Sequence, residues 1–179
     1  MKVEIEIPEG KKAEWVNEVL TLVDDKPKDV TERIKTFEDA RKELGSDHPL
    51  VEEYETITCR CGGLGDDIIA YMKLRIIAAA LNEGWKPEYT KEEYRYFPWF
   101  ILYTKEEIDE LTDEKKKFVL ARSCYVSSAS GGVAYAYAGY DASYTNTHIG
   151  SRLAFRNIEL AKYAGNQFID IWADFVFPS

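Results

Sequence analysis

The stretch that decides the fold is SCYVSSASGGVAYAYAGYDASYTNTHIGSRL, residues 123–153. Tyr, Gly, Ser and Ala replace nearly every charged residue in it, and residues 135–138 alternate strictly as Tyr-Ala-Tyr-Ala. Strict alternation of large and small side chains has the period of a β-strand, with aromatic rings on one face and methyl groups on the other. The pattern predicts a strand whose aromatic face, shared by Tyr135 and Tyr137, is either a ligand platform or the inner wall of a core.

Further strands are predicted on both sides of this run. Residues 97–103 are apolar on both faces, which is typical of a strand that is covered on both sides. The other candidates are short runs separated by turn residues, at 118–126, 133–138, 143–147 and 152–155. Because short connections join antiparallel neighbours, residues 94–156 are expected to form an antiparallel β-sheet meander.

Helical periodicity precedes the sheet. Apolar residues form a broad face over residues 66–82, and Gly84 follows, so this segment predicts a central apolar helix. Thr36 is placed to cap a shorter helix that stops at Gly45. The Gly-rich residues 55–65 are expected to be a loop between these two helices.

Two more helices are expected later in the chain. Thr104 and Glu107 have the spacing of a capping box, which predicts a short charged helix or loop that reaches Lys117. At the C-terminus, apolar residues recur at spacings of three and four with charged residues facing away. That pattern predicts one amphipathic helix over residues 157–176.

The N-terminal segment allows two interpretations. Residues 3–7 alternate as a strand, but residues 13–24 fit either a helical apolar stripe or two strands joined by a turn at Asn17 and Glu18. The β-branched and aromatic residues on both sides of that turn favour the hairpin.

These patterns define the expected fold class and its organisation. The class is α+β, an antiparallel β-sheet meander with packed helices that include the central apolar helix and the C-terminal amphipathic helix. The chain is expected to be a single domain, residues 1–179, without an internal repeat. Its parts are an N-terminal β-hairpin region (1–29), a helical region (30–93), the antiparallel sheet (94–156) and the C-terminal helix (157–176).

Composition limits the classes of partner. The chain has 32 acidic and 23 basic residues, a net charge of −9, so its field repels nucleic acid and anionic membranes. No stretch is long and apolar enough to span a membrane, and the first residues do not read as a secretory signal. The three cysteines do not have disulfide or zinc spacing. We therefore expect a cytoplasmic protein with no metal site and no cofactor.

A resemblance to a known family is carried by five segments: TERIKTFEDA (31–40), LNEGWKP (81–87), YFPWF (96–100), GSRLAF (150–155) and AKYAGNQFIDIWADF (161–175). With the N-terminal EIEIPEG, they resemble an uncharacterised family of small proteins of bacteriophages and prophages of gut bacteria. The family has no assigned activity, so no catalytic residue is carried over. The resemblance implies origin in a mobile element, and a place in the cytoplasm of the bacterial host or on the virion.

The candidate binding residues are aromatic residues of the sheet and nearby arginines. Exposed rings on a sheet can stack bases while arginines hold the backbone, but tyrosines also build ordinary cores. On this hypothesis Arg152 and Arg156 share one face of a strand. The full set is Trp99, Tyr135, Tyr137, Tyr140, Tyr144, Arg152 and Arg156.

Enzymatic chemistry has one candidate centre. His148 lies close in sequence to Asp141 and Tyr144 and could act as a general base. Neither a nucleophile elbow nor a zinc-protease motif accompanies it, so no catalytic residue is assigned.

Three functions follow, in order of preference. The first is a non-enzymatic, phage-type accessory or interaction protein that binds a host or phage protein through its aromatic-rich sheet region. The second is binding of a nucleotide or single-stranded nucleic acid by Tyr and Trp stacking with arginine contacts. The third is an enzyme with a site around His148. The sequence leaves the oligomeric state open.

Overall fold

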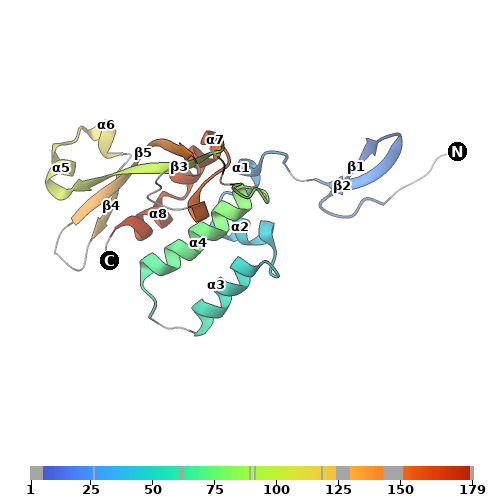
Figure 1. Cartoon of the computed structure of the whole chain (residues 1–179), viewed down its shortest axis with the longest axis horizontal. Helices are drawn as coiled ribbons and strands as arrows, with labels where there is room; N and C mark the ends of the chain where they lie inside the picture. The colour runs from blue at the N-terminus through green and yellow to red at the C-terminus, as the bar shows by residue number, and fades with distance from the viewer. Residues whose placement is uncertain are drawn as a thin grey trace.

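A computed structural model describes residues 6–25, 27–60, 63–88, 90, 92–117, 119–123, 130–142 and 151–177. It confirms the α+β class with antiparallel strand pairing. Figure 1 shows a body of helices and one sheet, with a two-stranded hairpin standing apart from it at the N-terminal side.

The hairpin consists of β1 (Lys11–Val16) and β2 (Val19–Asp24). Its turn residues Asn17 and Glu18 have φ angles of +49° and +65°. Positive φ at both central residues is the geometry of the two-residue turn that matches the twist of a hairpin. The structure thus confirms the hairpin over the helix. Residues 6 and 7 are outside any strand, however, and residues 3–5 lie outside the described residues.

Four helices follow: α1 (Val30–Arg33), α2 (Phe37–Leu44), α3 (Pro49–Arg60) and α4 (Asp66–Leu81). Thr36 caps α2 through a capping box with Asp39, and Gly45 ends it, as expected. The central helix α4 is also confirmed. It packs against α2, α3, α7 and α8, and residues on all sides of it are buried, which is typical of an interior helix.

Helix α3 corrects the prediction of a loop over residues 55–65. Pro49 occupies its first position, where a missing N–H costs nothing. The β-branched Thr56, Ile57 and Thr58 have modest helix propensity, but packing of α3 on α4 outweighs it. The helix continues to Arg60, and residues 61 and 62 lie outside the described residues.

The sheet contains β3 (Tyr94–Thr104), β4 (Leu120–Ser123) and β5 (Ser130–Ala142), all antiparallel. The strand order is β3-β5-β4, so β5 lies in the middle and the sequential order of a meander is not observed. The reason is the long connection after β3, which holds α5 (Lys105–Glu110) and α6 (Asp113–Lys116). The capping box of Thr104 and Glu107 that opens α5 is confirmed.

The segment after the sheet differs from its prediction. Residues 152–155 are not a strand: η1 (Ser151–Leu153) is a 3₁₀ helix, and one bridge joins Phe155 to Tyr96 at the edge of β3. The Phe155 N–H donates to the Tyr96 carbonyl at 2.7 Å, and the Tyr96 N–H donates back at 3.0 Å. The predicted strand at 143–147 lies outside the described residues.

The C-terminal helix is two helices, α7 (Ile158–Gln167) and α8 (Ile169–Val176), instead of one. Phe168 interrupts them with φ −113° and ψ 31°. The break lets α7 pack on β3 and β5, while α8 reaches α4 and β4. The body therefore has layers in the order sheet, α7 with α8, α4, and α2 with α3 (Figure 1).

Candidate functional site

A β-bulge changes the expected aromatic strand. In the register of β3 with β5, Trp99 lies opposite Tyr137 and Phe100 lies opposite Tyr135, so Ala136 is skipped. Directly opposed residues share a face, and neighbours along a strand alternate. Positions 135 and 137 therefore belong to opposite faces, and the prediction that Tyr135 and Tyr137 share one face is wrong.

Trp99 and Phe100 show what the two faces are. Trp99 is 38 % exposed, and its ring contacts Phe97 with centroids 6.1 Å apart. Ile101, on the same face as Trp99, is also exposed. Phe100 faces the helices, where its ring lies 5.3 Å from that of Trp172. Trp99 and Ile101 are thus exposed on the outer face, and Phe100 packs on the helices. Phe97, however, is buried on the outer face, and Leu102, on the face of Phe100, is exposed.

For the remaining predicted residues, the structure gives a strand position at most. Tyr140 pairs with Tyr96 in the register, but its side chain, like those of Tyr135 and Tyr137, is outside what the structure describes. Tyr144 and His148 lie outside the described residues altogether.

The two arginines do not share a strand face. Arg152 is exposed on η1. Arg156 follows the bridge at Phe155, and its guanidinium donates to the Asn82 carbonyl at 3.3 Å and to Glu83 Oε2 at 2.5 Å. Because Arg156 is held by a carboxylate, it is less available to a phosphate backbone.

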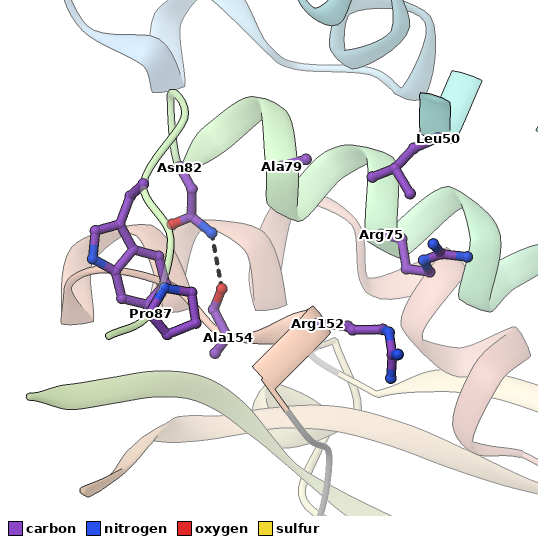
Figure 2. Close-up of a pocket in the computed structure, with 8 residues that line it drawn as sticks. Leu50, Arg75, Ala79, Asn82, Pro87, Arg152 and Ala154 are labelled. Carbon is purple, nitrogen blue, oxygen red and sulfur yellow. Dashed lines mark hydrogen bonds between the residues drawn. The ribbon is translucent and has the colours of Figure 1, made fainter. Parts of the chain in front are cut away.

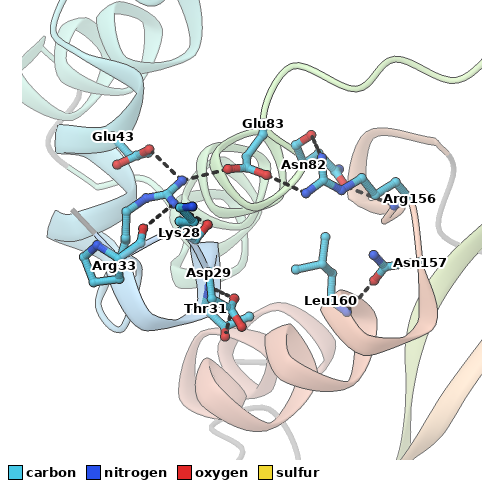
Figure 3. Close-up of polar contacts among 11 residues, drawn as sticks. Lys28, Asp29, Thr31, Arg33, Glu43, Asn82, Glu83, Arg156, Asn157 and Leu160 are labelled. Carbon is cyan, nitrogen blue, oxygen red and sulfur yellow. Dashed lines mark hydrogen bonds and ion pairs between the residues drawn. The ribbon is translucent and has the colours of Figure 1, made fainter. Parts of the chain in front are cut away.

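Glu83 links two separate parts of the body (Figure 3). Its Oε1 accepts from Arg33 at 2.7 Å and its Oε2 accepts from Arg156, while Arg33 also bonds to Glu43 at 3.1 Å. The hydrogen bonds from Arg33 first, and from Arg156 second, hold the pKa of the Glu83 carboxyl below its ordinary value. This cluster joins α1 and α2 to the end of α4 and to the segment before α7, so its arrangement is structural.

Asn82 makes a second link beside it. The buried side chain donates from Nδ2 to the Ala154 carbonyl at 2.9 Å, and its Oδ1 accepts the Arg156 N–H at 3.0 Å. The amide thus pairs with the backbone of a segment more than 70 residues away. This fixes the end of α4 against the chain that leaves η1.

The surface that sequence reasoning missed is one face of the hairpin. The register pairs Trp15 with Leu20 and Ala13 with Leu22, so these four apolar residues form one face, which we call the hairpin face. Trp15 is 74 % exposed, and Leu20 and Leu22 are exposed as well. The signal was present as alternation in residues 11–24, but alternation alone does not tell whether a face is covered.

The opposite side of the hairpin is more polar. This face holds Lys12, Glu14 and Thr21 together with Val16, Val19 and Val23. Glu14 lies opposite Thr21, and Lys12 forms an ion pair with Glu14 at 2.9 Å. The hairpin thus exposes apolar side chains on both faces, with Trp15 on the hairpin face and Val16 and Val19 on the opposite face. The principal packing partner of each of its strands is the other strand.

The described part of the chain holds neither a candidate metal cluster nor a candidate membrane span. Within the described residues, no three His, Cys, Asp or Glu side chains gather in a way that could hold a metal ion. None of the helices in the described part of the chain is both long enough and apolar enough to cross a membrane.

Comparison with known proteins found no match: no family model matches the chain, and neither a curated protein nor a solved structure matches it. The basis for a functional proposal is therefore geometry, exposure and charge, together with the sequence resemblance described above.

Proposed function

We propose that this chain is a non-enzymatic, phage-type interaction protein that binds a protein partner, with the hairpin face as its main contact. The observation that carries the proposal is the exposure of Trp15, Leu20 and Leu22 on an element that stands apart from the body (Figure 1). The resemblance to phage proteins supports a place in the host cytoplasm or on the virion.

The physical instability of an isolated hairpin supports a docking role. A two-stranded sheet alone is marginally stable in water, and it gains stability when one face packs on another surface. The hairpin face offers a Trp with Leu neighbours, and Trp is enriched among the residues that carry most of the energy of protein interfaces. Burial of this face by a partner would stabilise both the hairpin and the complex.

Charge favours a protein over a polyanion as the occupant. The hairpin and its ends, residues 6–28, carry six acidic and four basic residues, and the chain as a whole has a net charge of −9. Phosphate backbones and anionic lipid surfaces are repelled by such a field. An apolar protein surface with a basic rim is complementary to it.

The aromatic-rich sheet region is proposed as a second contact of the same function. Trp99 and Ile101 expose apolar area on the outer face of β3, and Tyr137 holds the register position opposite Trp99. Arg152, on η1, is also proposed as a residue of this second contact. The stacking of single-stranded nucleic acid is not favoured, because positions 135 and 137 lie on opposite faces and Arg156 is paired with Glu83.

The test is affinity capture of the tagged full chain from host lysate, with and without nuclease, read by mass spectrometry. Trp15→Ala removes the main anchor of the hairpin face, and Thr21→Ala, on the opposite face, is the matched control. We expect a protein that is retained after nuclease treatment, lost with Trp15→Ala and kept with Thr21→Ala.

Other outcomes contradict parts of the proposal. A partner that Trp15→Ala retains fully would exclude the hairpin face as the main contact. If the captured proteins are lost after nuclease treatment, binding of nucleic acid is favoured over binding of a protein. If sedimentation shows concentration-dependent dimers that Trp15→Ala abolishes, the occupant is a second copy of the chain.

A further inference from the structure

A pocket of about 200 Å³ lies beside α4. Figure 2 shows Arg75 and Ala79 of α4, Leu50 of α3, Arg152 of η1 and Pro87 of the loop after α4 around it. Segments far apart in sequence thus build one concave site in the body, away from the hairpin.

One end of the pocket is cationic. Arg75 is fixed by an ion pair with Glu53 at 2.9 Å, and its guanidinium lies over the Tyr71 ring at 5.8 Å. Arg152 makes no hydrogen bond or ion pair with any residue that the structure describes, although Arg33, Arg41 and Arg156 all do. Glu53 balances the charge of Arg75, so the net positive charge at this end comes from Arg152, and both guanidinium groups offer N–H donors to an anion.

The other end is apolar. Pro87 lies at the end of the pocket opposite the two arginines in Figure 2, and Trp85, two residues earlier on the same loop, also lines it. Leu50 adds an aliphatic wall. A flat ring or short chain can pack against Trp and Pro, whereas a fully hydrated ion gains nothing from them.

The lining limits both the size of the ligand and its chemistry. The pocket volume is below the roughly 300–1,000 Å³ of sites for drug-sized ligands. The pocket therefore fits a ligand of about the size of a single ring with one anionic group. Among the lining residues that the structure describes, no side chain carries a carboxylate, thiol, hydroxyl or imidazole group that could act as a nucleophile or general base. These described residues supply binding contacts.

We propose that this pocket binds a small organic anion, with its carboxylate or phosphate between Arg75 and Arg152 and its apolar body against Trp85 and Pro87. The planar fork of a guanidinium matches both carboxylate and phosphate oxygens. Arg152, which has no ion-pair partner among the described residues, supplies the contact that the ligand completes, and Arg75, held by Glu53, presents a fixed partner.

The test is titration of the ¹⁵N-labelled full chain with benzoate and, separately, with phenyl phosphate. The reporter is the indole N–H signal of Trp85, assigned by its loss in Trp85→Phe. We expect a saturable shift at millimolar concentrations, with Arg152→Gln weakening binding about tenfold because a charge-assisted contact is lost. Whichever probe binds more tightly identifies the preferred anionic group.

Matched controls decide whether the pocket itself is responsible. Arg60→Gln makes the same change of charge on the exposed last turn of α3, outside the pocket lining, and should leave binding unchanged. Benzyl alcohol, which lacks the anionic group, should bind much more weakly than benzoate. The proposal is overturned if neither anionic probe gives a saturable shift, if Arg60→Gln weakens binding as much as Arg152→Gln, or if benzyl alcohol binds as well as benzoate.

Discussion

Trp15 and Trp172 show the difference between the two parts of this molecule. Trp172, on α8, is 1 % exposed and packs against Phe100 and Phe175, whereas Trp15, on β1, is 74 % exposed. The same residue type thus belongs to a closed core in one region and to an uncovered face in the other. The body has its packing partners within the chain, whereas the hairpin face is not covered by any described part of it.

Polar groups follow the same division. In the body, Asn82 and Glu83 join α4 to distant segments through specific hydrogen bonds. In the hairpin, the ion pair of Lys12 and Glu14 joins two residues of one strand. The difference implies that substitutions in the body change the free energy of unfolding, while substitutions on the hairpin face change binding.

The largest effect is expected for Trp172→Ala. Loss of a fully buried indole leaves a cavity and should lower the free energy of unfolding by about 3–5 kcal/mol, measured by urea denaturation followed by circular dichroism. Trp172→Phe should cost much less, because the Nε1 of Trp172 has no hydrogen-bond partner among the described residues. A loss of only about 0.5 kcal/mol for the alanine variant, the usual range for a surface substitution, would show that Trp172 is not core.

A smaller loss is expected for Asn82→Ala. This change removes two buried hydrogen bonds and leaves the Ala154 carbonyl and the Arg156 N–H without their partner, at a cost of about 2–3 kcal/mol. Asn166→Ala is the control, since its amide bonds only to the Lys162 carbonyl on the exposed side of α7. Equal stability losses in the two variants would contradict the link described for Asn82.

Glu83→Gln should lower the free energy of unfolding by about 1 kcal/mol. Solvent screening keeps this value small, because the side chain is more than one-third exposed. The pKa of Glu83 is lower in the folded than in the unfolded chain, so its contribution is fully present above its ordinary pKa, near 4.5. The contribution is lost as the pH falls through the lower folded value. Glu83→Gln should therefore weaken the fall in stability on acidification, measured by urea denaturation between neutral and acidic pH.

The control for that measurement is Glu92→Gln, at an exposed position where no ion pair is found with a described residue. It should leave the acid dependence unchanged. The same slope of stability against pH in wild type and Glu83→Gln would show that the Arg33 and Arg156 contacts do not contribute.

The smallest effect on stability is expected for Trp15→Ala. Because Trp15 is exposed and the hairpin stands apart, the free energy of unfolding of the body should change by no more than about 0.5 kcal/mol. Acrylamide should quench the fluorescence of Trp15 far more than that of Trp172, as seen by comparing single-tryptophan variants. A stability loss above 1 kcal/mol, twice that ordinary surface range of about 0.5 kcal/mol, would mean that the hairpin packs on the body.

Local signals predicted much of the fold. The turn at Asn17 and Glu18, the cap at Thr36 and the capping box at Thr104 each depend on residues within a few positions, and all three are confirmed. The α4 helix was also predictable, because its apolar pattern is long and ends at turn residues.

The misses depend on contacts between distant residues. The skip at Ala136 is set by pairing with β3, and the break at Phe168 is set by packing of α7 and α8 on different layers. The sequence named Arg152 and Trp99 as candidates, but it expected the strand at 97–103 to be covered on both sides, whereas Trp99, Ile101 and Leu102 are exposed. It did not predict the pocket or the exposed hairpin face, because exposure depends on what the rest of the chain covers.

The interior position of α4 has a consequence for how the chain is made. Its apolar surface is covered by residues of η1, α7 and α8, which are synthesised long after it. At about 5–20 residues per second, the roughly 90 residues between Leu81 and Trp172 take several seconds to roughly 20 seconds to leave the ribosome. During that interval only α2 and α3 can cover the nascent helix, so a chaperone that holds apolar segments should bind its remaining apolar surface until α8 emerges.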